Sequence, residues 1–300
     1  MDVISRILRP FRNRRRQINW VEVADVQGSF YHATESLADV HRFFADEKNL
    51  PEAVATDVGS IKGICFVCRQ ESSFQIQRDP MTGEVNWRES LNCSGCGLIS
   101  RWRSNLHLFE NLCLPVVEDR IYMTERITPL YREVARRFPG TVGSEFRPDA
   151  APGGLLELPS GPIRNEDVTR LSFGDRSFEF VLSFDVLEHV PDYRSALGEF
   201  FRVLVRGGKL MFSVPFTFSE STETRAITND DGQTEHLLEP VYHGDPLSEK
   251  GVLCYRSFGM EILKEMRAVG FNDSFLVCFS SQEWAYYGAN VMFVGCKVSV

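Results

Sequence analysis

Four of the eight cysteines stand in two pairs whose spacing suits a metal ion. Cys65 and Cys68 form one C-x-x-C pair, and Cys93 and Cys96 form the second. A tight turn lets both thiolates of such a pair reach one ion, and two pairs complete a tetrahedral four-sulfur zinc site. Because four sulfurs leave no coordination position open, the spacing predicts a structural zinc. The other cysteines are isolated and predict small core residues: Cys113, Cys254, Cys278 and Cys296.

A second group of reactive side chains follows a buried strand. Phe178–Phe184 is a nearly unbroken apolar run, as a strand covered on both faces requires. Asp185, Glu188 and His189 follow it directly. Ligands of parallel α/β units bind at the carboxyl ends of the strands, so these three side chains are expected at a binding site.

The elements that must position this group are a helix and a further strand. Asp192 can cap a helix over 193–204, whose apolar residues recur at helical spacing. Gly207-Gly208 is expected to stop that helix, and residues 210–214 predict the next buried strand. Strand, helix and strand with short connections form a right-handed parallel unit.

The remainder of this large domain predicts further alternation of helices and strands. In chain order we expect a strand over 121–124, a helix from Pro129 that Thr128 caps, a strand over 141–144, a surface loop over 147–165, a polar lid-like insertion over 216–251, a helix over 260–269, and strands over 275–279 and 291–298.

Three stretches carry a family resemblance: Leu171-Ser172-Phe173, the motif from Asp185 to Val190, and Arg202-Val203-Leu204 with Gly207-Gly208. Over roughly residues 121–300 the chain resembles class I S-adenosylmethionine-dependent methyltransferases, most closely the small-molecule branch called type 11. The resemblance implies a seven-stranded, mostly parallel, Rossmann-like sheet and S-adenosylmethionine as cofactor.

The resemblance also assigns cofactor contacts. It implies that Glu145 accepts hydrogen bonds from both ribose hydroxyls and that Asp167 receives the adenine amino group. Val168 would add a backbone contact, and Asp185 would line the sulfonium side or orient the acceptor.

At the first strand the chain departs from the family, which has a glycine-rich turn there. Residues 125–129 read Glu-Arg-Ile-Thr-Pro and contain no glycine. In one interpretation the free N–H groups of the helix that begins at Thr128 hold the cofactor carboxylate, with Arg126 and Glu125 beside it. In the other, side chains block the pocket and the domain is a non-catalytic binding or scaffold protein.

Catalytic candidates come from two places. An acceptor hydroxyl needs a base near its proton, and His189 is the first candidate, with Asp185 beside it. In the insertion, His243 and Asp245 form a His-x-Asp pair that suits an oriented base or a clamp for a polyhydroxyl acceptor. The alternatives are a structural hydrogen bond for His189 and a plain turn at 244–246.

Basic residues stand beside tryptophans near the second cysteine pair, in Trp87-Arg88 and Arg101-Trp102-Arg103. Such a pattern suits nucleic acid, and some ribosomal-RNA methyltransferases resemble this arrangement. The alternative is that the tryptophans pack the small domain against the large one while the arginines face water. A net charge of −8 does not favour a polyphosphate partner.

We expect three regions: a basic arm and helical collar over 1–60, a zinc-ribbon-like module over 61–115, and a methyltransferase domain over 116–300. In the collar, Thr34 or Ser36 can cap a helix. No apolar run is long enough to span a bilayer, and no signal-peptide core is present, so a cytoplasmic protein is expected. The arginine-rich residues 1–16 are either a solvated arm or a peripheral anchor on the inner membrane face.

Together these features predict methyl transfer from S-adenosylmethionine to oxygen or nitrogen of a small molecule or a sugar or glycan precursor. The alternatives are an RNA methyltransferase that docks through its zinc module, and a scaffold that keeps the fold without catalysis.

Overall fold

The computed structural model describes residues 30–45, 59–158, 161–245 and 247–298. The basic segment 1–16, with its predicted roles, lies outside these described residues. Within them, no helix combines the length and the apolar character that crossing a bilayer requires.

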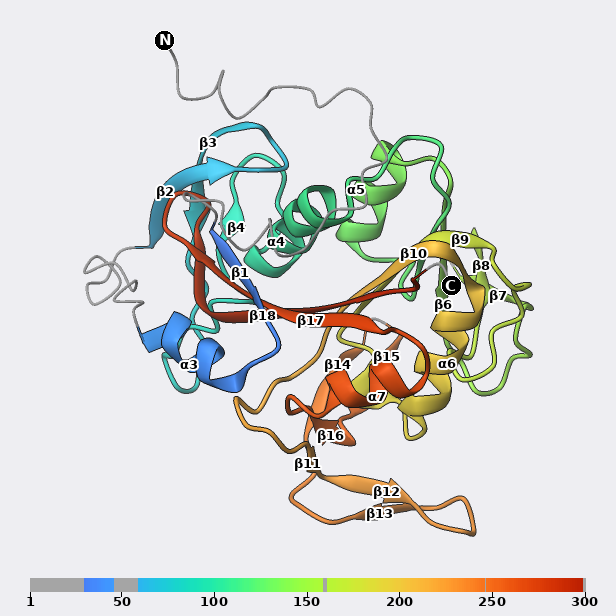
Figure 1. The fold of residues 1–300 in the computed structure, drawn as a ribbon. Helices are drawn as coiled ribbons and strands as arrows, with labels where there is room; N and C mark the ends of the chain where they lie inside the picture. Colours follow the sequence, from blue (N-terminus) through green and yellow to red (C-terminus); the bar gives the residue numbers. More distant parts are fainter. Residues whose placement is uncertain (1–29, 46–58, 159–160, 246, 299–300) are drawn as a thin grey trace.

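A nine-stranded sheet forms the centre of the molecule (Figure 1). Its strands lie in the order β1 (Tyr31–Thr34), β17 (Asp273–Ser281), β18 (Tyr286–Cys296), β10 (Leu204–Ser213), β9 (Phe178–Phe184), β5 (Ile121–Met123), β6 (Thr141–Glu145), β8 (Gly161–Asn165) and β7 (Leu155–Leu158). The pairs from β10 through β9, β5 and β6 to β8 are parallel. The pairs at both edges are antiparallel. This is a Rossmann-like α/β fold with a large mixed sheet.

The predicted sheet of seven mostly parallel strands was therefore too small and too uniform. β1 was expected in a packing collar, but it pairs with β17 and extends one edge. At the other edge, β7 and β8 form a hairpin where residues 147–165 were expected to be a surface loop. β7 and β8 are short, and their sequences show no clear alternation of apolar and polar residues. Their pairing therefore depends on the unpaired edge of the large sheet rather than on a local sequence pattern.

Helices cover both faces of the sheet. One face packs against α3 (Leu37–Ala45), α6 (Tyr193–Val203) and α7 (Ile262–Ala268); the other packs against α4 (Ser100–Leu108), the π-helical turn η2 (Phe109–Cys113) and α5 (Pro129–Arg137). Within β9, Val181 faces the first layer, whereas Phe180 and Leu182 face the second. This alternation is the reason why the strand is apolar at nearly every position.

Two predicted helix starts are confirmed. The Thr128 hydroxyl accepts a hydrogen bond from the Tyr131 N–H, and Pro129 is the first residue of α5. The Asp192 carboxylate accepts from the Ser195 N–H at the start of α6. The predicted end of α6 was wrong, because the helix ends at Val203 and Gly207-Gly208 lies in β10, where the register with β9 shifts.

The cysteine pairs lie on a small sheet of β2 (Ser60–Cys65), β3 (Gln70–Gln75) and β4 (Asn92–Cys93), all antiparallel. This module shares buried contacts with the large sheet, since Phe66 and Leu106 belong to one apolar cluster with Phe180 and Val294. Arg103 is fully buried between the two and donates to the carbonyls of Leu91, Trp284 and Ala285.

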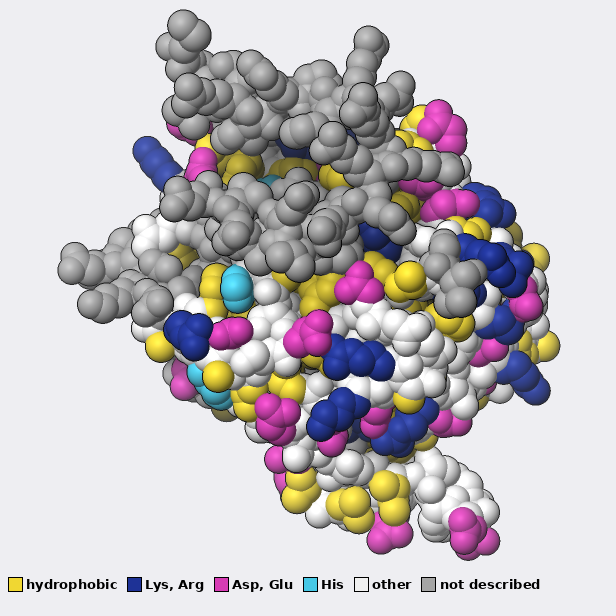
Figure 2. All heavy atoms as spheres, viewed as in Figure 1, with side chains coloured by type: hydrophobic (Ala, Val, Ile, Leu, Met, Phe, Trp, Pro, Cys, Tyr) yellow, Lys and Arg dark blue, Asp and Glu magenta, His cyan; other side chains and the backbone are white. Residues whose placement is uncertain are grey.

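The insertion over 216–251 and the residues directly after it form short antiparallel pairs: β11 (Glu223–Thr224) with β16 (Arg256–Ser257), β12 (Ala226–Thr228) with β13 (Thr234–His236), and β14 (Tyr242–Asp245) with β15 (Ser248–Leu253). The β12–β13 hairpin projects from the body (Figure 1). Hydrophobic and acidic side chains gather on this projection (Figure 2). Among the exposed apolar side chains of the insertion are Ile227, Leu237, Leu238, Val241 and Tyr242.

Candidate functional site

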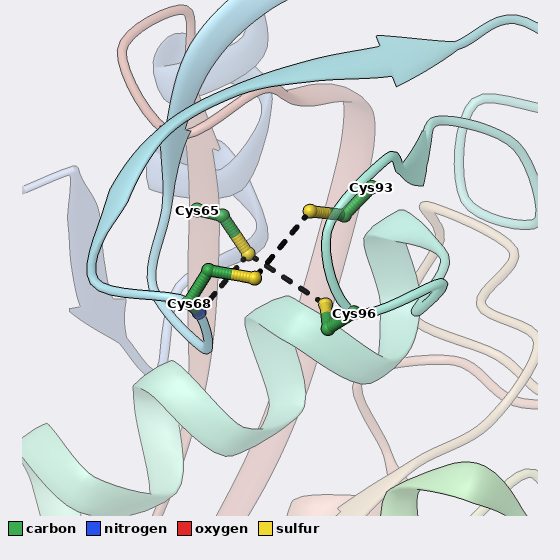
Figure 3. A group of neighbouring side chains, drawn as sticks. All are labelled: Cys65, Cys68, Cys93 and Cys96. Atoms are coloured by element: carbon green, nitrogen blue, oxygen red, sulfur yellow. Dashed lines mark hydrogen bonds between the residues drawn. The ribbon is translucent and has the colours of Figure 1, made fainter.

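The four paired cysteines converge on one point (Figure 3). The Sγ atoms of Cys65 and Cys96 lie 3.8 Å apart, and those of Cys68 and Cys93 lie 3.7 Å apart. All four lie within 4.8 Å of one another. Zinc–sulfur bonds of about 2.3 Å place the corners of a tetrahedron about 3.8 Å apart. The cluster therefore fits a four-thiolate zinc site, as the spacing predicted.

The surrounding backbone supports thiolates at these positions. The Cys68 N–H points at Cys65 Sγ, and the Gly95 N–H points at Cys93 Sγ. At Gly95 a Cβ atom would lie 2.9 Å from Cys68 Sγ, so only glycine permits this approach. The interaction with Cys96 lowers the pKa of the Cys65 thiol to about 5. The four lone cysteines, by contrast, are all buried, as predicted.

A second centre lies where the strand order of the large sheet reverses, between β5 and β9. Ligands of doubly wound folds bind outside the carboxyl ends of the strands at such a point. Glu125 follows β5 here, and Asp185 follows β9. Asp185 has a left-handed backbone with φ of 55°, a conformation that aspartate tolerates better than most residues and that is common at functional sites.

Two arginines from the cysteine module occupy this point. Arg88 Nη2 lies 2.5 Å from Asp185 Oδ1, and Arg101 Nη1 lies 2.7 Å from Asp185 Oδ2. Arg101 also donates to Glu89 at 3.0 Å. Burial alone would raise the pKa of Asp185, but the charges of Arg88 and Arg101 lower it to about 2.

The tryptophans pack against the large sheet, as the second interpretation expected, but neither interpretation placed the arginines at Asp185. Arg101 is mostly buried and engaged with carboxylates, and Arg103 is completely buried. These two side chains therefore neither face water nor offer a surface to RNA. Sequence position gave no sign of it, because Arg101 and Asp185 are 84 residues apart.

The glycine-free turn is held from the neighbouring strand. Glu145 ends β6, and its Oε1 accepts hydrogen bonds from the N–H groups of Arg126 (2.7 Å) and Ile127 (3.0 Å). The Arg126 guanidinium lies over the Tyr131 ring, 4.4 Å from its centre. The carboxylate that was predicted to bind ribose therefore also organises the turn that replaces the glycines.

Glu125 lies at this edge with a carboxylate oxygen that has no compensating partner. It is 8% exposed, and its Oε1 has no hydrogen-bond partner among the described residues. Burial raises its pKa to about 7. A buried carboxyl without a partner is costly, so this atom is suited to a ligand that brings a hydrogen-bond donor or a positive charge.

The predicted adenine contacts lie just beyond β8. Asp167 Oδ1 accepts from the N–H and the hydroxyl of Thr169, which shapes the loop, and Val168 is buried. Glu166, which received no predicted role, is 1% exposed and accepts from Arg164 and Ser172. Its bonds hold the same loop against β8.

Two of the predicted catalytic residues, His189 and His243, meet after β9. Glu188 and His189 lie in the 3-10 turn η3 (Leu187–His189), and His243 reaches them from β14. Glu188 Oε1 lies 3.7 Å from His189 Nε2 and 3.5 Å from His243 Nδ1. Burial raises the pKa of Glu188, and the interaction with this carboxylate raises the pKa of His243. The side chain of Asp245 lies outside the described residues.

Comparisons with known proteins agree with the resemblance. Residues 141–212, from β6 to β10, match the family model of a methyltransferase domain. A Mycolicibacterium smegmatis protein named "Probable S-adenosylmethionine-dependent methyltransferase" is 32% identical over 97 residues, which are 32% of this chain and 37% of that relative. These findings support a methyltransferase domain, and with it an enzyme. The chain spans about a third of the length of the curated relative it matches.

Three methyltransferases are among the solved structures to which the chain is similar. The phosphoethanolamine N-methyltransferase 2 of Haemonchus contortus is 14% identical, with a TM-score of 0.39 over 66% of this chain and 53% of its own. A Mesorhizobium loti S-adenosylmethionine-dependent methyltransferase is 15% identical, with a TM-score of 0.40 over 67% and 100%. A Burkholderia thailandensis 1,6-didemethyltoxoflavin-N1-methyltransferase is 15% identical, with a TM-score of 0.39 over 66% and 78%.

Proposed function

We propose that this protein transfers a methyl group from S-adenosylmethionine to an oxygen or nitrogen of a small molecule or a sugar or glycan precursor. The observation that carries this proposal is the position of the family match. It covers β6, β8, β9, α6 and most of β10. These strands lie on both sides of the switch point, and carboxylates follow β6, β8 and β9 at the edge where ligands of such folds bind.

The residues at this edge fit the cofactor. The unpartnered Oε1 of Glu125 suits the amino group of the methionine portion, and the capped start of α5 suits its carboxylate, with Arg126 and Thr128 nearby. Glu145, Asp167 and Val168 would hold ribose and adenine. S-adenosylmethionine supplies an electrophilic methyl group, so alignment of the acceptor by the protein can provide much of the acceleration.

His189 has the hydrogen bonding of a general base. Its Nδ1 lies 2.8 Å from the carbonyl oxygen of Leu253, which can only accept, so Nδ1 must carry the proton. In the neutral ring, Nε2 then presents a lone pair toward Glu188. Asp185, His243 and Asp245 remain the other catalytic predictions, with the insertion over 216–251 as a lid that brings His243 to the site.

The cysteine cluster has a different task in this proposal. A structural zinc would fix the turn at the start of α4 and thereby hold Arg101 against Asp185. The module over 61–115 would then be part of the wall of the site, which favours a small acceptor over RNA. A cytoplasmic location, with or without membrane contact through residues 1–16, completes the proposal.

A second candidate, a non-catalytic binding protein, has one specific observation in its favour. Arg88 and Arg101 already neutralise Asp185, and Glu145 already holds the turn, so several polar groups at the edge have protein partners. Cofactor binding separates the two candidates.

The test is calorimetric titration of zinc-loaded protein with S-adenosylmethionine and S-adenosylhomocysteine. We expect micromolar binding that is lost in Glu145→Ala and weakened in Asp167→Asn. Asp149→Ala is the matched control, since this exposed aspartate only pairs with Arg147. Glu145→Ala also removes the hydrogen bonds that hold the turn at Arg126 and Ile127. If this variant misfolds, cofactor binding by Asp167→Asn still tests the proposal. Absence of binding by the folded wild type would favour the scaffold.

A further inference from the structure

The cluster of Glu188, His189 and His243 has features that a hydrogen-bonded base does not need. Glu188 is 0% exposed, and neither carboxylate oxygen has a hydrogen-bond partner among the described residues. A buried carboxylate in this state costs several kcal/mol unless a partner compensates it. Arginines provide that compensation for Asp185 but do not reach Glu188 within hydrogen-bond distance.

The spacing of the ligand atoms points to the missing partner. One nitrogen of each imidazole faces Glu188 Oε1: His243 Nδ1 at 3.5 Å and His189 Nε2 at 3.7 Å. These distances are longer than those of hydrogen bonds, which are about 2.7–3.2 Å. All three donor atoms lie within 4.8 Å of one another. Metal–ligand bonds of about 2.1 Å place tetrahedral ligands about 3.4 Å apart, close to the observed distances.

The hydrogen bonds around these side chains also have the form of a metal site. The other nitrogen of His189 donates to the Leu253 carbonyl at 2.8 Å, the usual partner of a metal-binding histidine. Leu253 ends β15, which pairs with β14 and so carries His243. The hydrogen bonds of Arg256 to the carbonyls of Val190 and Pro191 fix the loop that follows η3. Ligands from distant segments are therefore held by one connected backbone network.

We propose that Glu188, His189 and His243 bind a divalent transition-metal ion such as Zn²⁺ or Co²⁺. Two imidazoles and one carboxylate suit this class of ion rather than Mg²⁺ or Ca²⁺. Three protein ligands leave coordination positions open, as in catalytic sites and unlike the four-cysteine cluster. The site deepens the proposed function, on which its role rests: an open position would take an oxygen of the acceptor, and His189 would be a ligand instead of the free base.

The test is titration of zinc-loaded protein with Co²⁺, without S-adenosylmethionine or acceptor. We expect saturable binding of one further ion with nitrogen and oxygen ligands, whose visible spectrum lacks the charge-transfer absorption of Co²⁺ bound to thiolates. Glu188→Gln and His243→Ala should weaken this binding by about 100-fold or more. His236→Ala, which removes an exposed histidine of the same insertion, should bind like the wild type.

Two outcomes would overturn the site: no saturable binding by the wild type, or unchanged binding by His243→Ala. Zinc at the cysteines, measured by elemental analysis, should be equal in all variants. If Glu188→Gln does not fold, His243→Ala still decides, because it changes a half-exposed side chain. Titration of the same samples with S-adenosylmethionine separates this inference from the proposed function, since either kind of binding can fail while the other is retained.

Discussion

Two regions of this molecule gather ionisable side chains in opposite ways. The four-cysteine cluster brings its donors from two turns, each contained within a few residues of chain. The carboxylate edge, by which we mean Glu125, Asp185 and Glu188, collects side chains from two parallel strands that are distant in sequence. In the first region the donors share one predicted partner. In the second, two arginines neutralise Asp185, two histidines face Glu188, and Oε1 of Glu125 has no hydrogen-bond partner among the described residues.

The three carboxylates of the edge accordingly differ in their pKa values. Asp185 has a pKa near 2 because two arginines reach it, whereas burial raises the pKa of Glu125 to about 7 and also raises that of Glu188. The two regions are nevertheless linked, because Arg88 precedes the second cysteine pair and Arg101 follows it. The cysteine module therefore supplies the positive charges that keep Asp185 ionised at this edge.

The largest effect is expected when the proposed zinc site that positions Arg88 and Arg101 loses a ligand. Cys93→Ser removes one ligand of a structural zinc, whose binding contributes on the order of 10 kcal/mol to folding in small zinc domains. We expect zinc loss, a lower melting temperature by circular dichroism, and loss of cofactor binding as Arg88 and Arg101 leave Asp185. Cys113→Ala, at a buried cysteine outside the cluster, should retain zinc. Equal zinc content in both variants would contradict the four-thiolate site.

The second largest effect is expected when Asp185, which pairs with Arg88 and Arg101, loses its negative charge. Asp185→Asn leaves two arginines without their buried partner and should lower the free energy of unfolding by about 3–5 kcal/mol. Urea denaturation at pH 7 measures it. Because the pKa of Asp185 is lowered from 3.8 to about 2, the stabilisation is present above about pH 4 and is lost as the pH falls toward 2.

The control for this variant is Asp175→Asn. Asp175 pairs with Arg202 at 2.9 Å, but its side chain is 72% exposed, so its loss should cost about 1 kcal/mol or less. Equal costs at the two positions would mean that the arginines do not stabilise the edge through Asp185.

A smaller effect with the opposite sign is expected at Glu125. Its pKa is raised from 4.5 to about 7, so the folded state binds its proton more tightly and stability falls as the pH rises from about 4.5 to 7. Glu125→Gln should abolish this fall, which leaves the variant more stable than the wild type by about 3 kcal/mol above pH 7. Urea denaturation across this pH range measures the difference. Parallel curves for the two proteins would show that Glu125 is ionised without penalty.

The smallest effect is expected at Thr128, in the turn beside the carboxylate edge. Thr128→Ala removes the cap of α5 and should cost about 1 kcal/mol in thermal unfolding, because the Tyr131 N–H loses its acceptor. Thr128→Ser retains a hydroxyl and should restore most of this loss. A cost similar to that of Asp185→Asn would mean that the cap, and not the ion pairs, organises this edge.

Several features could be read from local sequence because their causes are local. The caps at Thr128 and Asp192 depend on residues three positions away, and the apolar run of β9 reports burial on both faces. The C-x-x-C pairs are closed by turns within a few residues. Even so, β1, β7 and β8 were not predicted, because these strands form only by pairing at the edges of the sheet.

The residue types of this protein's chemistry could be read from the chain alone: the paired cysteines, the acids after the strands, and the histidines near them. Which of these side chains meet depends on the tertiary structure. Arg101 reaches Asp185 across 84 residues, and His243 reaches Glu188 from a separate hairpin. A charged side chain has the same local pattern whether it is solvated or paired, and packing between distant elements is what distinguishes the two.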